Sequence, residues 1–450
     1  MTNRLGTTVR SEPAPLPPGA APRRWGAVVA HSPDAAAIGQ VIPLVSREIH
    51  LGREPPPGPH VRIALPDQRI SRLHAAVLVD GPTARVVDRE SSNGLFVDGR
   101  RVAGAPIDAG SVLRLGDTLL VIERGDPVPA GDDQGLEMIG RSPELSALRA
   151  LIRGIAPSPL AALIIGETGT GKELVARALH HLGRRSGPFV PINCAAIPAA
   201  LVESTLFGHR KGGFTGATTD QEGAFGRADR GTLFLDEVGE LSLESQPKLL
   251  RVLEDGEVTA VGAGRPVRVD VRIVTATNRP LDDAVAAGRF REDLLARLAG
   301  VTIATPPLRQ RRGDILPLFR FFAGRGGERA LSADFAEALL LAAWPQNVRA
   351  LAKLAERLGV LHAAQATWDL SLLDETLARP VRERVDGDGD DDDGDDDANG
   401  IEGPPTKDEL LALLARFQGN VSLLAAHVKR NRKQVYRWMD DLGIKRGTGR

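Results

Sequence analysis

Residues 163–172 read Leu-Ile-Ile-Gly-Glu-Thr-Gly-Thr-Gly-Lys, and this stretch decides the fold of the middle of the chain. Its three apolar residues predict a buried strand, and the pattern of residues 172–182 predicts a helix directly after the glycines. Such a loop lets backbone N–H groups surround phosphates at the start of a helix, where Lys172 reaches the β- and γ-phosphates. The spacing therefore predicts an ATP-binding loop. Its cofactor-binding residues are Gly166, Glu167, Thr168, Gly169, Thr170, Gly171, Lys172 and Glu173.

The second half of an ATPase site lies at residues 232–237, Thr-Leu-Phe-Leu-Asp-Glu, an apolar strand that ends in two carboxylates. We expect Asp236 to hold Mg²⁺ and Glu237 to polarise the attacking water. One hydroxyl ligand to Mg²⁺ is missing from the loop, because Glu173 stands where Ser or Thr is usual. Residues 271–275 predict a further buried strand, and helical segments between the strands are typical of a parallel α/β domain.

The pattern changes on both sides of these strands. Residues 1–23 are rich in Pro, Ala and Arg and are predicted to be disordered. From 24 to 125, short β-branched runs between Gly, Pro and Asp turns predict an all-β sandwich. Helical periodicity at 334–343 and 348–362 predicts a smaller helical subdomain after the sheet.

Composition excludes several classes of protein. A chain of 450 residues suggests about three domains, and 42% hydrophobic with 26% charged residues is ordinary for a soluble protein. Cys194 is the only cysteine, which rules out an internal disulfide framework and fits a reducing compartment. We find no secretory signal, no stretch near the ~18 uncharged apolar residues of a membrane span, and no spaced histidine ligand set. We therefore expect a cytoplasmic protein without a structural metal.

The C-terminal part has a strong charge asymmetry. Residues 386–397 contain nine aspartates and no apolar residue, whereas 406–450 contain ten Lys or Arg against four Asp or Glu, a balance of +6. Residues 407–417, 422–428 and 432–442 predict three helices. An acidic, extended spacer before a small basic end indicates a linker and a nucleic-acid module.

Between the two ATPase motifs lies a glycine-rich hexapeptide that suits a loop tip better than a core segment. We expect Phe214 and Thr215 to touch a partner. The hexapeptide consists of Gly212, Gly213, Phe214, Thr215, Gly216 and Ala217.

With these motifs, residues 138–378 resemble the AAA+ domain of sigma-54-dependent transcriptional activators, the bacterial enhancer-binding proteins. The resemblance implies that the hexapeptide contacts sigma-54. The family usually has alanine where this chain has Gly213, which loosens the loop. Gln346 stands where glycine is common, and Ala350 stands where glutamate is common.

The resemblance also implies roles for single residues. Asn193 restrains the catalytic glutamate, Asn278 of sensor I reports the γ-phosphate, and Arg349 belongs to sensor II. Arg291 and Arg297 lie in the segment that supplies arginine fingers to the neighbouring subunit. Fingers supplied in trans imply a homo-oligomer, in this family usually a hexameric ring.

Three short motifs in the sandwich resemble the forkhead-associated (FHA) domain, which binds phosphothreonine. They are Leu-Gly-Arg-Glu at 51–54, Ile-Ser-Arg-Leu-His at 70–74 and Ser-Ser-Asn-Gly at 91–94. A phosphate dianion needs guanidinium and hydroxyl donors, and Asn93 would bond the peptide backbone. The phosphothreonine-binding residues are then Arg53, Ser71, Arg72, Ser92 and Asn93. We expect His74 to brace the loops. The alternative is a folded FHA domain that binds no phosphopeptide.

The ligand would be a phosphothreonine-containing protein or the chain's own N-terminal tail, through Thr7 or Thr8. At the other end, residues 419–444 resemble the Fis-type helix-turn-helix of these activators. Its last helix would enter the major groove of enhancer DNA. The candidate DNA-binding residues are Asn431, Arg432, Lys433, Gln434 and Arg437. A basic helical hairpin that binds protein is the alternative.

The sequence thus predicts a multidomain protein. Its parts are a disordered tail (1–23), an all-β FHA sandwich (24–125), a linker (126–137), an α/β AAA+ P-loop ATPase with a small helical subdomain (138–378), an acidic linker (379–404) and an all-α helix-turn-helix (405–450). The expected function is a sigma-54-dependent transcriptional regulator. It would use ATP and Mg²⁺ to remodel sigma-54 RNA polymerase. Two alternatives stay open: a DNA-binding AAA+ scaffold, and a remodeller of another target.

Overall fold

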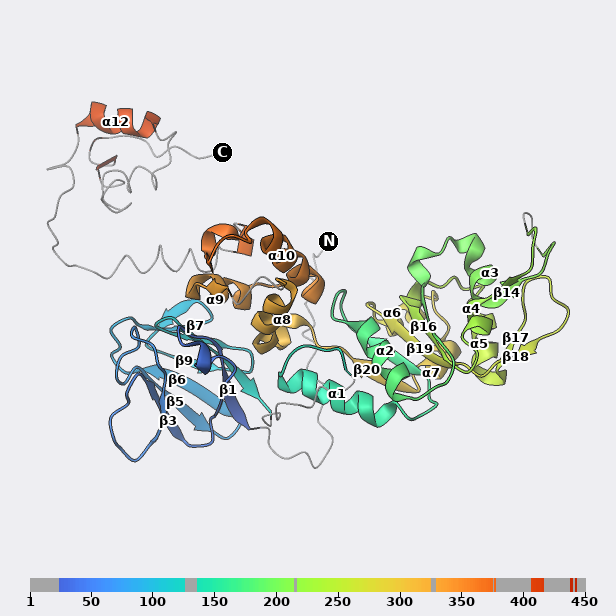
Figure 1. The fold of residues 1–450 in the computed structure, drawn as a ribbon, viewed down its shortest axis with the longest axis horizontal. Coiled ribbons are helices and arrows are strands. Elements are labelled where there is room, and N and C mark those ends of the chain that lie inside the picture. The colour runs from blue at the N-terminus through green and yellow to red at the C-terminus, as the bar shows by residue number, and fades with distance from the viewer. Residues whose placement is uncertain are drawn as a thin grey trace, which may run out of the picture. The chain divides into compact units, whose positions relative to one another are not determined.

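The computed structural model describes residues 24–125, 136–213, 217–324, 329–374, 376–377, 406–416, 438–439 and 442. The chain forms two compact units, 1–388 and 389–450 (Figure 1). The predicted tail and the predicted acidic linker lie outside the described residues. Among the helices that are described, none is long and apolar enough to cross a membrane.

The N-terminal part is a β-sandwich of two sheets, as the sequence predicted. One sheet has the order β2-β1-β11-β10-β7-β8 and the other β4-β3-β5-β6-β9. Their inner faces enclose one apolar core that includes Trp25, Ile49, Val77 and Leu113. The strands are β1 (Trp25–His31), β2 (Val41–Pro43), β3 (Glu48–Gly52), β4 (Val61–Ala64), β5 (Ala75–Asp80), β6 (Thr83–Asp88), β7 (Leu95–Val97), β8 (Arg100–Val102), β9 (Gly104–Ile107), β10 (Val112–Leu115) and β11 (Thr118–Arg124).

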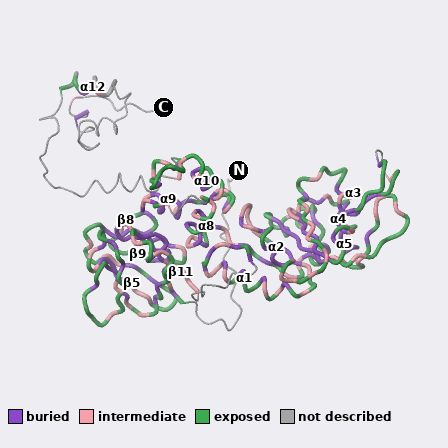
Figure 2. The backbone as a smooth tube through the Cα atoms, viewed as in Figure 1, coloured by how far each residue is buried: buried purple, intermediate pink, exposed green. Residues whose placement is uncertain are grey.

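The central part is a parallel five-stranded sheet in the order β13-β16-β19-β12-β20, which confirms the predicted α/β class. Separate apolar clusters cover its two faces. Figure 2 shows the buried residues concentrated in the interior of this part and of the sandwich. The strands are β12 (Ala162–Ile165), β13 (Phe189–Asn193), β16 (Thr232–Asp236), β19 (Arg272–Thr277) and β20 (Val301–Ala304). The helices are α1 (Pro143–Ile155), α2 (Lys172–Leu182), α3 (Val202–Phe207), α4 (Ala224–Arg227), α5 (Gln246–Asp255), α6 (Leu281–Ala286) and α7 (Glu292–Leu298).

Two short hairpins project from this domain. One pairs β14 (Gly208–His209) with β15 (Gln221–Glu222), and the other pairs β17 (Glu257–Val258) with β18 (Val267–Arg268). The glycine-rich hexapeptide is carried by the first hairpin, and its central residues 214–216 lie outside the described residues.

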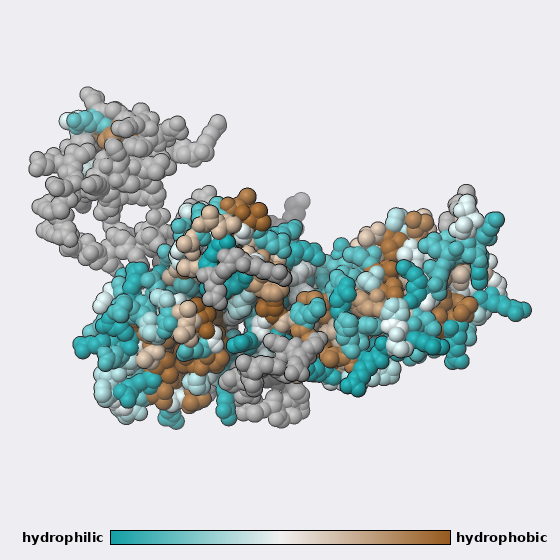
Figure 3. All heavy atoms as spheres, viewed as in Figure 1, coloured by the Kyte–Doolittle hydropathy of each residue, from teal (hydrophilic) through white to brown (hydrophobic). Residues whose placement is uncertain are grey.

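A small helical subdomain follows the sheet and forms the lid. It consists of α8 (Ile315–Phe322), α9 (Ala333–Leu341) and α10 (Asn347–Leu361), with a parallel pair of β21 (Ala330–Leu331) and β22 (Thr367–Trp368). The rings of Phe319 and Trp368 pack edge to face with centroids 5.7 Å apart. Figure 3 shows a hydrophobic patch over α10, where Val360 and Leu361 are exposed. Helices α9 and α10 begin and end within two residues of the helices that the sequence predicted at 334–343 and 348–362.

Seven short 3₁₀ turns connect the described elements of the first unit. They are η1 (Ala35–Ala37), η2 (Cys194–Ala196), η3 (Ala199–Leu201), η4 (Val238–Glu240), η5 (Leu308–Gln310), η6 (Arg312–Asp314) and η7 (Leu370–Leu372).

The second unit is described in small part. Helix α12 (Lys407–Arg416) agrees with the first predicted helix of this end, and Trp438 and Met439 are buried. The five candidate DNA-binding residues and the other two predicted helices, apart from residues 438–439 and 442, lie outside the described residues.

Candidate functional site

The glycine loop connects the end of β12 to the start of α2, as the sequence predicted. Gly171 caps the helix with φ of +103°, and Gly169 has φ of +79°, conformations that side chains rarely adopt. The Nζ of Lys172 donates to the Gly166 carbonyl at 2.9 Å, and the lysine is buried. The loop therefore holds a cation and a helix N-terminus at one point, which suits a polyphosphate.

The two carboxylates at the end of β16 lie beside this loop. Glu237 Oε1 is 3.9 Å from Lys172 Nζ, and Glu237 has φ of +50°, a strained conformation for a non-glycine residue. The backbone N–H of Glu237 donates to Asp236 at 3.0 Å. The order of the parallel sheet therefore brings the glycine loop and the acidic pair to the same edge.

Asn278, at the end of β19, connects the glycine loop to Glu237. Its backbone N–H donates to Glu237 Oε2 at 3.2 Å, and its side-chain amide donates to Thr168 Oγ1, also at 3.2 Å. A change at the phosphate end of the loop would therefore reach the carboxylate through one residue.

Asn193 ends β13 and lines the same cavity as Asp236 and Glu237. Its side-chain oxygen accepts from the N–H of Ala195 at 3.0 Å, where it caps η2. The restraint on Glu237 that the family resemblance assigns to Asn193 thus stays a prediction.

The lid closes directly over the glycine loop through residues that the motif search did not single out. The Asn347 amide donates to Glu167 Oε2 and to the Thr168 carbonyl, both at 3.1 Å. The N–H of Val348 donates to the Gly169 carbonyl at 3.0 Å. Asn347 lies two residues before Arg349, inside the sensor II-like segment at 344–349, Trp-Pro-Gln-Asn-Val-Arg, and this position was the signal that the sequence offered.

An ion pair fixes the outer side of the loop. Arg309 donates to both oxygens of Glu167, at 2.6 and 2.8 Å, and this bond holds the pKa of that carboxyl below its usual range. Glu167 is therefore occupied by the lid rather than turned toward a nucleotide.

The same loop touches the sensor II segment very closely. A Cβ on Gly169 would lie 2.1 Å from the Gln346 carbonyl oxygen and 3.0 Å from the Cβ of Arg349. Only glycine fits at this position. Arg349 also lines the nucleotide cavity.

Residues 168–173 of the glycine loop, Asn193, Asp236, Glu237 and Arg349 border a cavity of about 1360 Å³. Its other lining residues near the loop include Ile139, Gly140, Leu316 and Val348, which offer an apolar wall suited to a base. The cavity continues to the edge of β1 and β2, so it is larger than a single nucleotide requires.

The two candidate arginine fingers do not line this cavity. Arg291 precedes α7 and pairs with Asp293 at 2.6 Å, and Arg297 pairs with Glu254 at 3.4 Å. Both guanidinium side chains are exposed. They are therefore free of the subunit's own ATP site, as a role toward a neighbouring subunit would require.

The base of the glycine-rich loop is closely packed. The N–H of Gly212 donates to the carbonyl of Ala217 at 2.9 Å and closes the loop. A Cβ on Gly213 would lie 2.7 Å from the Val261 carbonyl oxygen. We expected Gly213 to loosen the loop. The structure instead shows that a side chain at this position would collide with the Val261 carbonyl, which explains the glycine. Phe214, Thr215 and Gly216 lie outside the described residues.

In the sandwich, the three FHA-like motifs meet at one end. The N–H of Ser92 donates to Ser71 Oγ at 3.0 Å, and the Asn93 amide donates to the Arg69 carbonyl at 2.7 Å. Arg53 is exposed and donates to Gln68 at 3.0 Å. Arg72, between these loops, is also exposed.

His74 is fully buried between the two loops. Its Nδ1 accepts from the N–H of Ser71 at 3.2 Å, so its Nε2 carries the proton and donates to the Gly94 carbonyl at 3.0 Å. Burial lowers the pKa of His74, which favours this neutral form. His74 thus braces the loops, as expected. Gly52 is equally constrained, because a Cβ there would lie 2.0 Å from the Arg72 carbonyl oxygen.

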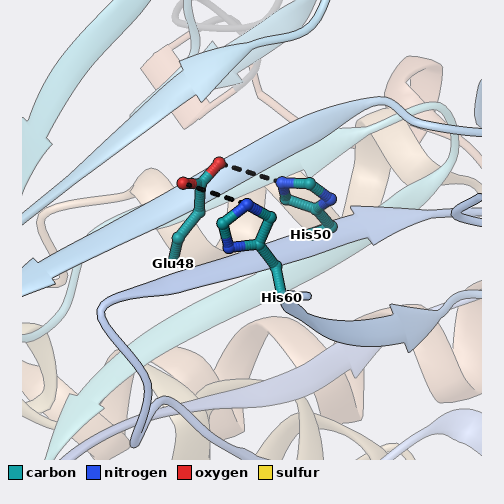
Figure 4. A group of neighbouring side chains, drawn as sticks. All are labelled: Glu48, His50 and His60. Carbon is teal, nitrogen blue, oxygen red and sulfur yellow. Dashed lines mark hydrogen bonds and ion pairs between the residues drawn. The ribbon is translucent and has the colours of Figure 1, made fainter. Parts of the chain in front are cut away.

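One cluster of possible metal ligands lies elsewhere on the sandwich. The rings of His50 and His60 both face the Glu48 carboxylate, at 2.9 and 3.7 Å (Figure 4). Arg89 also donates to this carboxylate at 2.8 Å. Because the arginine already neutralises Glu48 and would repel a cation, we interpret the cluster as a local ion-pair network.

Three family models match the chain. A sigma-54 interaction domain matches residues 138–304, an FHA domain matches 49–116, and an AAA+ ATPase lid domain matches 309–387.

Several curated proteins are similar to the chain. The DNA-binding transcriptional regulator NtrC of Azospirillum brasilense is 46% identical over 274 residues, which cover 58% of this chain and 57% of NtrC. The transcriptional regulatory protein ZraR of Klebsiella oxytoca is 44% identical over 305 residues, covering 66% of this chain and 67% of ZraR. The chain therefore spans little more than half of the NtrC relative.

Among solved structures, NtrX from Brucella abortus in complex with ATP is 34% identical with a TM-score of 0.50. The match covers 68% of this chain and 69% of NtrX. The same protein in complex with ADP gives 32% identity and a TM-score of 0.51, covering 69% and 70%.

Proposed function

Because the chain belongs to the family of NtrC-like transcriptional regulators with a sigma-54 interaction domain, we propose that it hydrolyses ATP to remodel sigma-54 RNA polymerase at promoters. One observation carries the ATPase assignment. Lys172, Glu237 and Asn278 come from three separate segments and meet at one edge of the sheet beside Asp236.

The described residues fit ATP and Mg²⁺. A helix N-terminus and the buried Lys172 face the cavity, and Asp236 supplies a hard oxygen ligand at its edge. Bound Mg²⁺ would neutralise charge on the β- and γ-phosphates. Asp236 would hold that ion, and Lys172 would leave the Gly166 carbonyl to bind phosphate oxygens.

Glu237 would then orient and polarise the attacking water, from which its carboxylate takes the proton. Its strained backbone and its bond from the Asn278 N–H keep the carboxylate aimed at the loop. The Asn278 side chain, which here bonds Thr168, would bond the γ-phosphate when ATP is present, so loss of that phosphate would shift Asn278 and with it Glu237. This change would be passed to the β14–β15 hairpin, whose loop is proposed to contact sigma-54.

Hydrolysis would be completed across a subunit boundary. The exposed Arg291 and Arg297 are proposed to reach the γ-phosphate in a neighbouring subunit of a hexameric ring, where they stabilise charge in the transition state. The C-terminal basic end would hold the ring at enhancer DNA, and phosphothreonine binding to the FHA domain would control it.

The experiment is a comparison of nucleotide binding and turnover in the full chain. Glu237→Gln should bind ATP as tightly as the original protein but lose turnover by roughly 100-fold or more. The matched control is Glu244→Gln, which changes an exposed glutamate in the same region and should leave both unchanged. Normal turnover in Glu237→Gln would remove Glu237 from the mechanism.

A further inference from the structure

The sandwich and the lid share one apolar core. Strands β10 and β11 pack against helix α9. Val112, Leu119 and Val121 of the sandwich are at most 1% exposed and belong to the same cluster as Phe335 and Leu339 of the lid. Burial of these apolar side chains away from water stabilises the contact. The sandwich therefore packs directly on the lid.

A buried ion pair crosses the same contact. Arg114 Nη1 donates to Glu337 Oε2 at 2.7 Å and to Asp334 Oδ1 at 2.6 Å. The Arg114 side chain is 9% exposed and that of Glu337 is 1% exposed. Arg312 adds a second connection, since its guanidinium donates to Asp98 at 2.8 Å. Loss of one partner would leave a buried charge uncompensated, so the lid responds strongly to the position of Arg114.

On its other side, Arg114 is connected by polar contacts to the loops that are proposed to bind the phosphopeptide. Asp117 Oδ1 lies 3.5 Å from Arg114 Nη2 and accepts from Arg69 Nη1 at 3.2 Å. The backbone carbonyl of Arg69 in turn accepts from the Asn93 amide. The backbone N–H of Asp117 donates to Asp67 Oδ2 at 2.8 Å, which fixes the turn that carries Asp117.

We propose that the FHA domain controls the ATPase through its lid, by the ion-pair chain that runs from Arg69 through Asp117 and Arg114 to Glu337. This inference rests on the proposed phosphothreonine binding. It identifies the contact through which the FHA domain acts on the lid, and it states whether peptide binding raises or lowers ATP turnover.

The direction of control, that is, whether a bound peptide raises or lowers ATP turnover, follows from the contacts that the peptide must displace. Arg53 now bonds Gln68 and Asn93 bonds the Arg69 carbonyl, so a phosphopeptide that takes Arg53 and Asn93 releases this turn. Its dianion also attracts Arg69 away from Asp117. Asp117 then competes with Glu337 for Arg114, and the hold of the sandwich on the lid weakens. The peptide-free sandwich restrains the lid, and the peptide releases it.

The test uses the full chain and a degenerate peptide mixture with phosphothreonine between four random residues on each side. The same mixture with threonine is its control. Affinity for the mixture and ATP turnover are measured separately. In the original protein the phosphorylated mixture should bind and raise turnover by about fivefold or more.

The informative variant is Arg114→Met combined with Glu337→Met, which replaces the buried pair by apolar side chains. It should bind the mixture with unchanged affinity, and its turnover should no longer respond to the mixture, because no ion pair is left for the peptide to disturb. Arg85→Met, in an exposed position on β6, is the matched control and should respond like the original protein. A double variant that still responds overturns the inference, and so does an original protein that binds the mixture without a change in turnover.

Failure of the mixture to bind would instead refute the phosphothreonine proposal. The link to the lid is then decided by Asp117→Asn, which removes the charge between Arg69 and Arg114 and leaves Arg53, Ser71, Asn93 and the ATP site unchanged. A changed turnover upholds the link, and an unchanged turnover overturns it.

Discussion

The backbone N–H of Asn278 donates to the Glu237 carboxylate at 3.2 Å. Asn278 also donates from its side chain to Thr168, so one residue connects the glycine loop to the carboxylate that is proposed to be catalytic. The position of Glu237 and the proposed sensing of the nucleotide therefore depend on the same residue, the first through its backbone N–H and the second through its side chain.

The first prediction concerns this connection. Asn278→Ala keeps the backbone N–H but removes the bond to Thr168, so ATP should still bind while turnover falls by roughly 10- to 100-fold. Binding is measured with a fluorescent ATP analogue and turnover by phosphate release. Unchanged turnover would show that the Thr168 bond has no part in catalysis.

The second prediction concerns the base of the glycine-rich loop at residues 212–217. In Gly213→Ala the new Cβ meets the Val261 carbonyl oxygen at 2.7 Å, so the hairpin must shift and stability should fall by about 1–3 kcal/mol. Thermal unfolding measures the loss. Gly264→Ala is the matched control, because a Cβ at Gly264 has no atom within 4 Å. Equal stability of the two variants would mean that the close contact is absent in solution.

The third prediction separates two histidines of the sandwich. His74→Ala removes the bonds to both FHA loops and should weaken phosphothreonine peptide binding by roughly tenfold or more, although His74 itself is buried. His60→Ala removes a half-exposed partner of Glu48 and should bind normally. Fluorescence anisotropy with a labelled peptide gives both affinities. Equal losses in the two variants would contradict the bracing role.

The fourth prediction is a pH dependence at the contact between the sandwich and the ATPase. Burial, together with Asp314 and Glu144 nearby, raises the pKa of Glu123 to about 8. A group with a raised pKa favours the folded state when protonated. The stability it contributes is therefore complete below its ordinary pKa of 4.5 and is lost as pH rises through about 8.

Thermal unfolding of the full chain between pH 6 and pH 9 measures this loss. Glu123→Gln cannot ionise, so its unfolding temperature should vary less with pH across this range than that of the original protein. Identical pH profiles would show that Glu123 keeps an ordinary pKa.

Local motifs explain how much of the site could be predicted from the sequence. The glycine loop and the acidic strand end are each encoded within eight residues, and the alternation of strands and helices requires them to meet at one edge of the sheet. The structure brings Lys172 and Glu237 within 3.9 Å accordingly. The bracing role of His74 could likewise be predicted from the sequence, because its motif lies between two loops that must converge.

Contacts between distant segments could not be predicted in this way. Arg114 and Glu337 are 223 residues apart, and neither lies in a motif. Their pairing depends on which face of the sandwich meets the lid, and this is set by apolar packing over both surfaces. The role of Gly213 has the same origin, since the Val261 carbonyl that excludes a side chain belongs to another loop.

Promoter opening in vitro shows whether ATP hydrolysis acts on sigma-54 through the loop at residues 212–217. Melting of a sigma-54 promoter by sigma-54 RNA polymerase is followed in vitro by permanganate reactivity of unpaired thymines, with the full chain and ATP. We expect ATP-dependent melting by the original protein and its loss in Thr215→Ala, with ATP turnover retained within about threefold. Melting that is absent with the original protein, or that persists in Thr215→Ala, would contradict the claim that ATP hydrolysis acts on sigma-54 through this loop.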